Sequence, residues 1–477
     1  MDRTIQRIID YDKCTGCQLC YNVCRFGAIT IGLSKKGFYI PRINFEKCIN
    51  CGECSEYCPI ENGPTGTVSL IGVYAAKSNN DEIRAKSSSG GIFSELADQI
   101  LEKKGIVFGA GFDDDNILFH MAVNDEIGLT KLRGSKYIQS NIGLSYKKVQ
   151  GYLNENKEVM FVGTPCQTTA LKNYIGSNDN LLLVDLVCHG VPSRIIFEKY
   201  LCYIFDDEKP KDIYFRDKQD EGWNNYFVRL EGRQTTYKKN HRKDPFFMGF
   251  LKNLYLNKIC YDCPFCKIPR NSDITLGDFW GVSNELDDNK GISLVLINSN
   301  KGQKAFENLM AEKRITSSIS GLEVGTKQNP RVIEGHMKIP ENRNDILREA
   351  SRLTFEEIDN QFIKSPKEEV LTYVQKCIRT KPIAIFGTGS GGQKVFDKIL
   401  KLDTGTIKYF LDNDAKKEGT KFCDVTIYKP CKVQNEKDNI FIVVASSYYD
   451  EIAKQLISIG FIENKDFIDG LKYLFFD

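Results

Sequence analysis

Two short stretches decide the fold of the N-terminal part of the chain: CTGCQLCYNVC, from Cys14 to Cys24, and CINCGECSEYCP, from Cys48 to Pro59. Each has the spacing C-x2-C-x2-C-x3-C, and every cysteine of the first stretch recurs 34 positions later in the second. Eight of the 17 cysteines of the chain lie here. The repeat predicts two similar half-sites, each offering four thiolates to a metal centre.

This spacing is typical of bacterial two-cluster ferredoxins, where three cysteines of one stretch bind a 4Fe–4S cluster and the fourth binds the other cluster. We therefore expect two clusters that carry single electrons. The predicted ligands are Cys14, Cys17, Cys20 and Cys58 for one cluster, and Cys48, Cys51, Cys54 and Cys24 for the other. Structural zinc is the alternative, but zinc sites pair C-x2-C knuckles across a longer loop, which suits two compact quartets less well.

Composition narrows the possible functions. With 477 residues the chain should hold about three domains, because roughly 100–200 residues make one. The net charge is +2 and no long basic run occurs, so nucleic-acid binding is not supported. The N-terminus has no apolar signal region, and no apolar stretch approaches the roughly 20 residues of a membrane span. We expect a cytoplasmic protein whose reduced thiols bind metal, in a low-oxygen setting.

Apolar runs and turn residues divide the rest of the chain. Short apolar strands alternate with helical periodicity after residue 70, which predicts a mixed α/β arrangement. Expected elements include strands over 71–76, 159–163 and 181–187 and a helix over 90–104. The expected fold class is α/β and multidomain: an α+β ferredoxin domain (1–65), a mixed α/β domain (66–310), a helical linker region (311–378) and a small Rossmann-like domain (379–477).

A second group of cysteines lies in the central region. Cys260, Cys263 and Cys266 occur in KICYDCPFCKIPR, whereas Cys166 and Cys188 follow predicted strands. A cysteine at a strand end that opens a helix has a lowered pKa, which suits a metal ligand or a nucleophile. These residues could therefore make a third four-thiolate site. Two alternatives stay open: zinc at the C-x2-C knuckle, and isolated cysteines that pack as small hydrophobic side chains.

The C-terminal region carries a glycine fingerprint. A predicted strand, Ile383–Phe386, runs into Gly387, Gly389 and Gly392 and then into a helix, which is G-x-G-x-x-G in the expected context. A second predicted strand, Ile407–Leu411, ends at Asp412, about 20 residues later, where an acid can bind a ribose hydroxyl. The pattern favours binding of a nucleotide or nucleotide-sugar, and a docking role is the alternative.

Seven motifs of the central region occur in one order. They are SSSGGIFSELA (87–97), RGSKYIQS (133–140), FVGTPCQ (161–167), DLVCHGVPS (185–193), FRDK (215–218), CYDCPFC (260–266) and SDITLGDFWG (272–281). Together they resemble the family of deazaflavin-coenzyme hydrogenase and dehydrogenase beta subunits, whose members are iron–sulfur flavoproteins. The resemblance covers roughly residues 66–310 and includes the fused ferredoxin. Similar proteins are also met beside exopolysaccharide and pyruvyl-transfer enzymes.

The resemblance implies two further cofactors. A third 4Fe–4S cluster would use Cys166, Cys188, Cys260 and Cys263, with Cys266 as a spare or alternate ligand. Bound FAD would place its pyrophosphate at Ser87, Ser88, Ser89, Gly90 and Gly91, because small residues open a helix there. Arg133, Ser135 and Lys136 would supply further contacts to the phosphates or the flavin. Taken without the resemblance, the serine and glycine run is an ordinary helix start.

These observations together indicate a ferredoxin-linked, flavin-dependent oxidoreductase. Its expected partners are an electron donor or acceptor protein, such as ferredoxin or an oxidoreductase subunit, and a small-molecule substrate, with glycan or exopolysaccharide metabolism as a candidate setting. The alternative is an electron-transfer subunit that docks onto a separate catalytic partner and has no substrate of its own.

Overall fold

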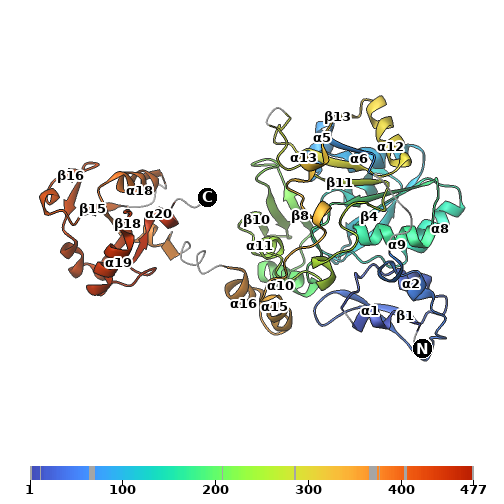
Figure 1. Cartoon of the computed structure of the whole chain (residues 1–477), viewed down its shortest axis with the longest axis horizontal. Helices are drawn as coiled ribbons and strands as arrows, with labels where there is room; N and C mark the ends of the chain where they lie inside the picture. The colour runs from blue at the N-terminus through green and yellow to red at the C-terminus, as the bar shows by residue number, and fades with distance from the viewer. Residues whose placement is uncertain are drawn as a thin grey trace. The chain divides into compact units, whose positions relative to one another are not determined.

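The chain forms two compact units in this computed structural model, Met1–Ile363 and Lys364–Asp477 (Figure 1). The structure describes residues 3–10, 12–63, 70–206, 208–283, 286–364, 373–374, 376–401 and 406–474. Both units combine helices with mixed sheets, so the predicted α/β, multidomain fold class is confirmed. The predicted boundary at residue 65 lies outside the described residues, and the domain limits stay a prediction.

The N-terminal module consists of one β-hairpin and short helices. Its elements are α1 (Gln6–Asp10), α2 (Leu19–Val23), β1 (Ile29–Leu33), β2 (Tyr39–Ile43), α3 (Glu53–Glu56) and α4 (Pro59–Asn62). The hairpin turn needs Gly37, whose φ is +80° and whose Cβ would lie 2.4 Å from Ser193 Oγ. The Gly37 carbonyl accepts a hydrogen bond from Arg194 N at 2.9 Å. The turn therefore packs closely against the start of a helix of the central region.

An eight-stranded sheet forms the centre of the first unit, in the order β13-β3-β12-β11-β7-β6-β4-β5. The strands are β3 (Gly72–Ser78), β4 (Ile106–Phe112), β5 (Leu118–Val123), β6 (Val159–Gly163), β7 (Leu181–Leu186), β11 (Ile274–Asp278), β12 (Ser293–Ile297) and β13 (Ile315–Ile319). β4, β6, β7 and β11 run parallel, and the others join antiparallel. The carboxyl ends of the parallel strands therefore meet at one edge.

Helices and the N-terminal module cover the two faces of this sheet. The helices are α5 (Asp81–Lys86), α6 (Ile92–Glu102), α7 (Glu126–Leu132), α8 (Ser145–Asn154), α9 (Pro165–Ile175) and α12 (Asn300–Ala311). One core joins α6, α7 and α12 to the sheet. The other core joins α8, α9 and the N-terminal module, with Leu19 and Val23 beside Phe161 and Ala170. The N-terminal module thus shares a hydrophobic core with the sheet.

An aromatic-rich core supports much of the remaining part of the first unit. It includes a three-stranded antiparallel sheet, β10-β9-β8. The elements are α10 (Arg194–Phe205), β8 (Asp212–Asp217), β9 (Phe227–Glu231), β10 (Thr236–Asn240), α11 (Pro245–Leu251), a 3-10 helix η1 (Lys258–Tyr261), α13 (Leu322–Thr326), α14 (Arg331–Glu334), α15 (Arg343–Glu349), α16 (Phe355–Ile358) and a π-helix η2 (Asp359–Ile363). The stretch expected to be helical also contributes β13, which pairs with β3.

The second unit is a six-stranded sheet in the order β16-β17-β15-β14-β18-β19, parallel except for β16. Its strands are β14 (Ile383–Phe386), β15 (Ile407–Leu411), β16 (Lys421–Phe422), β17 (Val425–Tyr428), β18 (Phe441–Val444) and β19 (Phe467–Asp469). Its helices are α18 (Ser390–Lys401), η3 (Ala415–Lys417), η4 (Pro430–Asn435), η5 (Lys437–Asn439), α19 (Tyr449–Ser458) and α20 (Gly470–Tyr473). Among the described residues of both units, every helix is too short or too polar to span a membrane.

Candidate functional site

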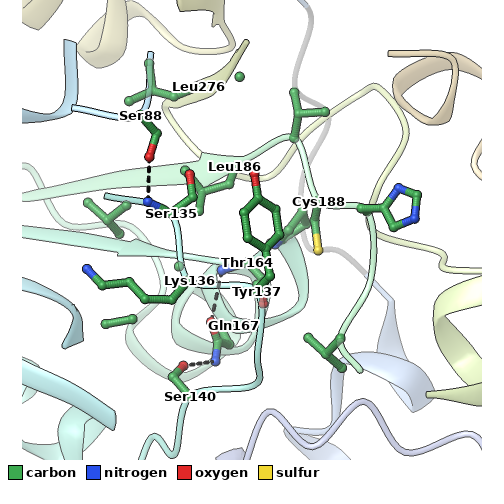
Figure 2. Close-up of a pocket in the computed structure, with 18 of the residues that line it drawn as sticks. Ser88, Ser135, Lys136, Tyr137, Ser140, Thr164, Gln167, Leu186, Cys188 and Leu276 are labelled. Atoms are coloured by element: carbon green, nitrogen blue, oxygen red, sulfur yellow. Dashed lines mark hydrogen bonds between the residues drawn. The ribbon is translucent and has the colours of Figure 1, made fainter. Parts of the chain in front are cut away.

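A cavity of about 300 Å³ opens at the carboxyl edge of β6, β7 and β11 (Figure 2). The segments that follow β6 and β7, Thr164–Gln167 and Val187–Val191, line it together with Asp278, the last residue of β11. Ligands of open α/β sheets bind outside the carboxyl ends of the strands, because the loops there diverge. The topology of the sheet therefore places this cavity where a ligand is expected.

The second group of cysteines gathers in this cavity. Cys166, Cys188, Cys260, Cys263 and Cys266 all line it, although they come from three separate segments of the chain. Cys166 lies in the first turn of α9, which Thr164 caps, and Thr164 Oγ1 is 3.2 Å from Cys166 Sγ. Burial raises the pKa of Cys260 to about 12 and also raises the pKa of Cys188. These thiols therefore stay protonated unless a cation compensates their charge.

One arginine joins the segments that carry these cysteines. Arg331, at the start of α14, lines the same cavity, and its guanidinium donates hydrogen bonds to the carbonyl oxygens of His189 and Cys260. Its Nη2 also lies 3.5 Å from Cys266 Sγ. The thiol of Cys266 donates to the carbonyl oxygens of Cys263, at 3.3 Å, and Gly335, at 3.1 Å. No sequence motif pointed to Arg331.

The predicted pyrophosphate turn lies at the same cavity. Ser87, Ser88, Ser89 and Gly91 line it together with Ser135 and Lys136. The Ser135 amide donates to Ser88 Oγ at 2.7 Å, which joins the two motifs (Figure 2). Gly91, with φ +90°, is the N-cap of α6 and provides no side-chain cap. The Ser94 amide donates to the Gly91 carbonyl oxygen at 3.0 Å, whereas Gly91 offers no side chain to the amides of Ile92 and Phe93, as at an anion-binding helix N-terminus.

Two residues of the predicted cofactor site serve other contacts. A Cβ on Gly90 would lie 2.4 Å from the carbonyl oxygen of Ala76, so this glycine allows the turn to pack on β3. Arg133 lines a separate cleft with Asp98 and Glu126, and its Nε donates to Ser94 Oγ at 3.1 Å. The structure therefore does not bring Arg133 to the main cavity.

Lys136 lines the cavity, but its ammonium group is bound to the protein. Nζ donates to the carbonyl oxygens of Lys131, Leu132 and Arg133, at 3.1, 2.8 and 2.8 Å. These carbonyls end helix α7, where a cation is favourable. Burial lowers the pKa of Lys136 to about 7. Lys136 therefore caps a helix beside the cavity, and in Figure 2 its ammonium points away from Tyr137.

Tyr137 also lines the cavity. It belongs to the motif RGSKYIQS, but we did not predict it as a site residue from the sequence. The Tyr137 hydroxyl accepts from Arg216 Nη1 at 3.4 Å, and Arg216 pairs with Asp278 at 2.6 Å. Trp223 Nε1 donates to the other oxygen of Asp278 at 3.1 Å and stacks on Trp280, with ring centroids 4.4 Å apart. Tyr137 and Asp278 thus form a polar, hydrogen-bonding part of the cavity wall.

The first set of predicted ferredoxin ligands lines one small cavity. Cys14, Cys17, Cys20 and Cys58 come together there, between α1, α2 and β2. Burial and the repulsion of neighbouring thiolates raise the pKa of Cys14 to about 12, and burial with the charge of Cys58 raises that of Cys17 to about 11. Four convergent thiols fit the donor set of an iron–sulfur cluster.

The second predicted set lies nearer to the solvent. Cys51 is exposed, Cys24 and Cys48 are half-buried, and Cys54 is buried. Burial raises the pKa of Cys54, and the charges of Cys51 and Cys48 act in the same direction, so these three thiols are neighbours. Within the described part of the chain, no three His, Cys, Asp or Glu side chains lie close enough together to hold a single metal ion.

Hydrogen bonds join the inner ferredoxin loop to the main cavity. The Tyr146 hydroxyl donates to the carbonyl oxygens of Cys17, at 3.0 Å, and Gln167, at 3.2 Å. Gln139 Nε2 donates to the Thr15 carbonyl oxygen at 2.8 Å, and Asn257 Nδ2 to that of Cys14 at 3.2 Å. The loop that carries the inner cysteines is thus held directly against the segments that carry the third group.

In the second unit, the turn formed by Gly387, Gly389 and Gly392 packs closely at one of its glycines and is open at another. A Cβ on Gly392 would lie 2.2 Å from the Gly387 carbonyl oxygen, whereas one on Gly389 would meet no atom within 4 Å. Asp412 accepts hydrogen bonds from Thr388 and from Lys417 Nζ, the latter at 2.9 Å. The predicted ribose-binding acid is therefore adjacent to the turn, but it is paired with a lysine.

Four family profiles match the chain. Residues 13–62 match the 4Fe-4S dicluster domain. Residues 73–143 and 156–319 match the N-terminal and C-terminal parts of the family described as coenzyme F420 hydrogenase/dehydrogenase, beta subunit. Residues 379–467 match a family described as C2185-like, N-terminal.

Individual relatives cover separate parts of the chain. One component of the F420H2 dehydrogenase of Methanosarcina mazei is 25% identical over 206 residues, which is 39% of this chain and 56% of that protein. The chain thus spans little more than half of that relative. An uncharacterised ferredoxin of Methanocaldococcus jannaschii is 36% identical over 55 residues, 12% of this chain and 70% of that protein.

Among solved structures, a chain of the F420-reducing NiFe hydrogenase complex of Methanosarcina barkeri aligns with a TM-score of 0.39 and 18% identity, covering 64% of this chain and 93% of that one.

Proposed function

Because the chain belongs to the family of coenzyme F420 hydrogenase and dehydrogenase beta subunits, with a two-cluster ferredoxin module fused to it, we propose that it is an iron–sulfur flavoprotein oxidoreductase. One observation carries the proposal. A single cavity is lined both by the third group of cysteines and by the serine and glycine turn that opens α6. A cluster and a flavin would therefore occupy adjoining parts of one site.

The burial of the cysteines supports a path for electrons between the protein surface and this cavity. The set with Cys51 is the nearer to solvent, whereas Cys17 and Cys20 of the other set are buried. Thr15, in the loop of this latter set, lines the main cavity. Iron–sulfur clusters carry single electrons, and FAD couples one-electron to two-electron chemistry. The exposed ferredoxin set would thus face an electron donor or acceptor protein, and the cavity would face a small-molecule substrate.

The cradle proposed for FAD has three parts. The uncapped amides at the N-terminus of α6 would face the pyrophosphate. Ser87, Ser88, Ser89 and Ser135 would offer hydroxyl groups along the same wall. Apolar side chains that line the cavity, such as Phe93, Leu186 and Leu276, would exclude water from the ring system. The residues present therefore fit a dinucleotide, and the fit does not require Arg133.

An alternative function is that of an electron-transfer subunit that has no substrate of its own. The Methanosarcina mazei relative favours this alternative, since it is one subunit of a dehydrogenase. Reduced ferredoxin mixed anaerobically with the purified protein separates the two. The oxidoreductase proposal predicts that the iron–sulfur absorbance bleaches first and flavin absorbance follows. Bleaching of the clusters in protein that neither contains nor accepts flavin would favour the electron-transfer subunit.

For the second unit we propose binding of a nucleotide or nucleotide-sugar at the turn formed by Gly387, Gly389 and Gly392. The space beside Gly389 and the position of Asp412 support this proposal. Titration of the full chain with NAD, NADP and nucleotide-sugars tests it, with Asp412→Ala as the variant. Binding that is weakened by Asp412→Ala supports the site. No binding of any of them at millimolar concentration would favour a docking role.

A further inference from the structure

We propose that Arg331 is a positioning residue that joins the two cysteine segments of the third group and raises the reduction potential of the iron–sulfur centre held there. This inference rests on the third centre of the proposed function. It adds a role for a residue outside both beta-subunit profile matches, which end at residue 319. The segment around α14 also lies in the region that we predicted from the sequence to be a helical linker (311–378).

The contacts of Arg331 define its positioning role. One amino group of the guanidinium donates to the His189 carbonyl oxygen, immediately after Cys188, and the other donates to the Cys260 carbonyl oxygen. The two arms of one planar group therefore fix the distance between the segments that carry these cysteines. A guanidinium suits this task because its donors are held in a rigid fork, whereas an ammonium is a single point.

The backbone around Arg331 holds it in place. Val332 O accepts from Ile268 N at 2.9 Å, and Met337 N donates to Tyr261 O at 2.8 Å, so this segment runs along the loop that carries Cys260, Cys263 and Cys266. Asn329 Nδ2 donates to the Asp278 carbonyl oxygen at 2.9 Å, which ties the same segment to the end of β11. The segment that carries Arg331 is therefore held at the cavity by hydrogen bonds to the cysteine loop and to the end of β11.

Arg331 also contacts Cys266, the fifth cysteine that lines the cavity. The Cys266 sulfur is within hydrogen-bonding reach of Arg331 Nη2 and donates to the carbonyl oxygens of Cys263 and Gly335. The Cys266 sulfur thus lies among protein groups on three sides. We keep Cys166, Cys188, Cys260 and Cys263 as the ligands that the family resemblance implies, with Cys266 as a neighbour of the centre that Arg331 contacts.

The charge of Arg331 favours the reduced state of a bound cluster. Its guanidinium acts electrostatically on Cys188, Cys260 and Cys266 together. A cluster with four thiolate ligands is anionic and becomes more so when it accepts an electron. A fixed cation beside it therefore stabilises the reduced form, since net charge and hydrogen bonds set the potential of such clusters. In a buried site this effect is weakly screened by solvent.

Three variants of the full chain test the proposal. Arg331→Gln removes both the charge and the fork, and Arg331→Lys keeps the charge but not the fork. Arg348→Gln is the control, because Arg348 pairs with Asp345 and Glu349 on the exposed face of α15. Each protein is purified anaerobically, its iron and sulfide are quantified, and its centres are titrated by electron paramagnetic resonance. Cys188→Ser identifies the signal of the third centre by its loss.

The expected result separates charge from position. In Arg331→Gln the third centre shifts about tenfold toward oxidation at a given potential, about 59 mV for one electron, or is lost. In Arg331→Lys the potential stays near the wild-type value, while the signal broadens or its occupancy falls. Unchanged potential and occupancy in Arg331→Gln would refute the role of Arg331 alone. A wild-type protein with only two centres would instead refute the third centre of the proposed function.

Discussion

The hydroxyl of Tyr146 donates a hydrogen bond to the carbonyl oxygen of Cys17, at a distance of 3.0 Å. The same hydroxyl lies 3.2 Å from the carbonyl oxygen of Gln167, the residue after Cys166. One buried tyrosine on α8 thus contacts the loop of an inner ferredoxin cysteine and the helix that carries a cysteine of the third group. The ferredoxin module is therefore part of the first unit, and these hydrogen bonds hold its inner cysteine loop beside the cavity.

This relationship predicts the effect of Tyr146→Phe. The substitution leaves the ring in the core but removes the donor to two buried carbonyl oxygens, so we expect a loss of about 1–3 kcal/mol in the free energy of unfolding. Denaturant unfolding of the first unit measures the loss. Tyr152→Phe on the same helix is the control, because Tyr152 is only partly buried. Equal stability of the two variants would contradict the bridging role.

The third group of cysteines predicts a selective loss of metal. Cys188→Ser should lower the iron and sulfide content by about one third, because one of three proposed clusters loses a thiolate ligand. Cys202→Ser is the matched control, since Cys202 is exposed on α10. Anaerobic iron and sulfide analysis measures both variants. If Cys188→Ser keeps the full content, Cys188 is not a ligand.

The contacts of Arg133 predict that it is not needed for the flavin. Arg133→Gln should leave the flavin content unchanged, because Arg133 bonds to Ser94 and lines the cleft beside Asp98. Ser135→Leu should lower the flavin content, because a larger apolar side chain would enter the cavity that Ser135 lines. Flavin released on denaturation is measured by fluorescence. Loss of flavin in Arg133→Gln, with normal iron content, would place Arg133 at the cofactor instead.

The same cleft predicts a pH-dependent stability. Burial raises the pKa of Asp98 to about 6, above its value of about 4 in an unfolded chain. Between these values the folded state holds a proton that the unfolded state has released, so the free energy of unfolding falls as the pH rises through this window. Asp98→Asn removes this penalty and should raise the melting temperature more at pH 7.5 than at pH 5.

The exposed Asp179 supplies the control for this experiment, because Asp179→Asn makes the same change of charge at the surface. The effect of Asp98→Asn on the melting temperature should change between pH 5 and pH 7.5 by more than the effect of Asp179→Asn does. An Asp98→Asn gain that is equal at both pH values would show that the carboxyl group titrates as it does in water.

Local patterns predicted much of the architecture. The cysteine repeat indicated the ferredoxin module, and the seven ordered motifs indicated the family of beta subunits, a resemblance that the profile matches confirm. The apolar runs at 159–163, 383–386 and 407–411 coincide with β6, β14 and β15. Such signals are readable because buried parallel strands are continuous apolar runs. The polar ITSSI sequence of β13 has no such run, so this edge strand was not predicted.

The candidate site was predictable only as a set of motifs. The sequence indicated Cys166, Cys188 and Cys260, and the structure gathers them in one cavity. It could not show that Lys136 caps α7 or that Arg331 reaches two backbone carbonyls, because those contacts depend on the packing of segments far apart in the chain. The sequence does not show which groups the side chain of a basic residue contacts, because its neighbours are known only from the fold.

The most direct test of the central claim is one anaerobic purification in which iron, acid-labile sulfide, zinc and flavin are quantified in the same sample. The proposal predicts iron and sulfide in equal amounts, sufficient for three 4Fe–4S clusters, with one FAD per chain and no stoichiometric zinc. Full loading with iron and sulfide, in protein that neither contains nor accepts flavin, would contradict the oxidoreductase proposal and leave the electron-transfer subunit. Stoichiometric zinc without labile sulfide would contradict the iron–sulfur assignment itself.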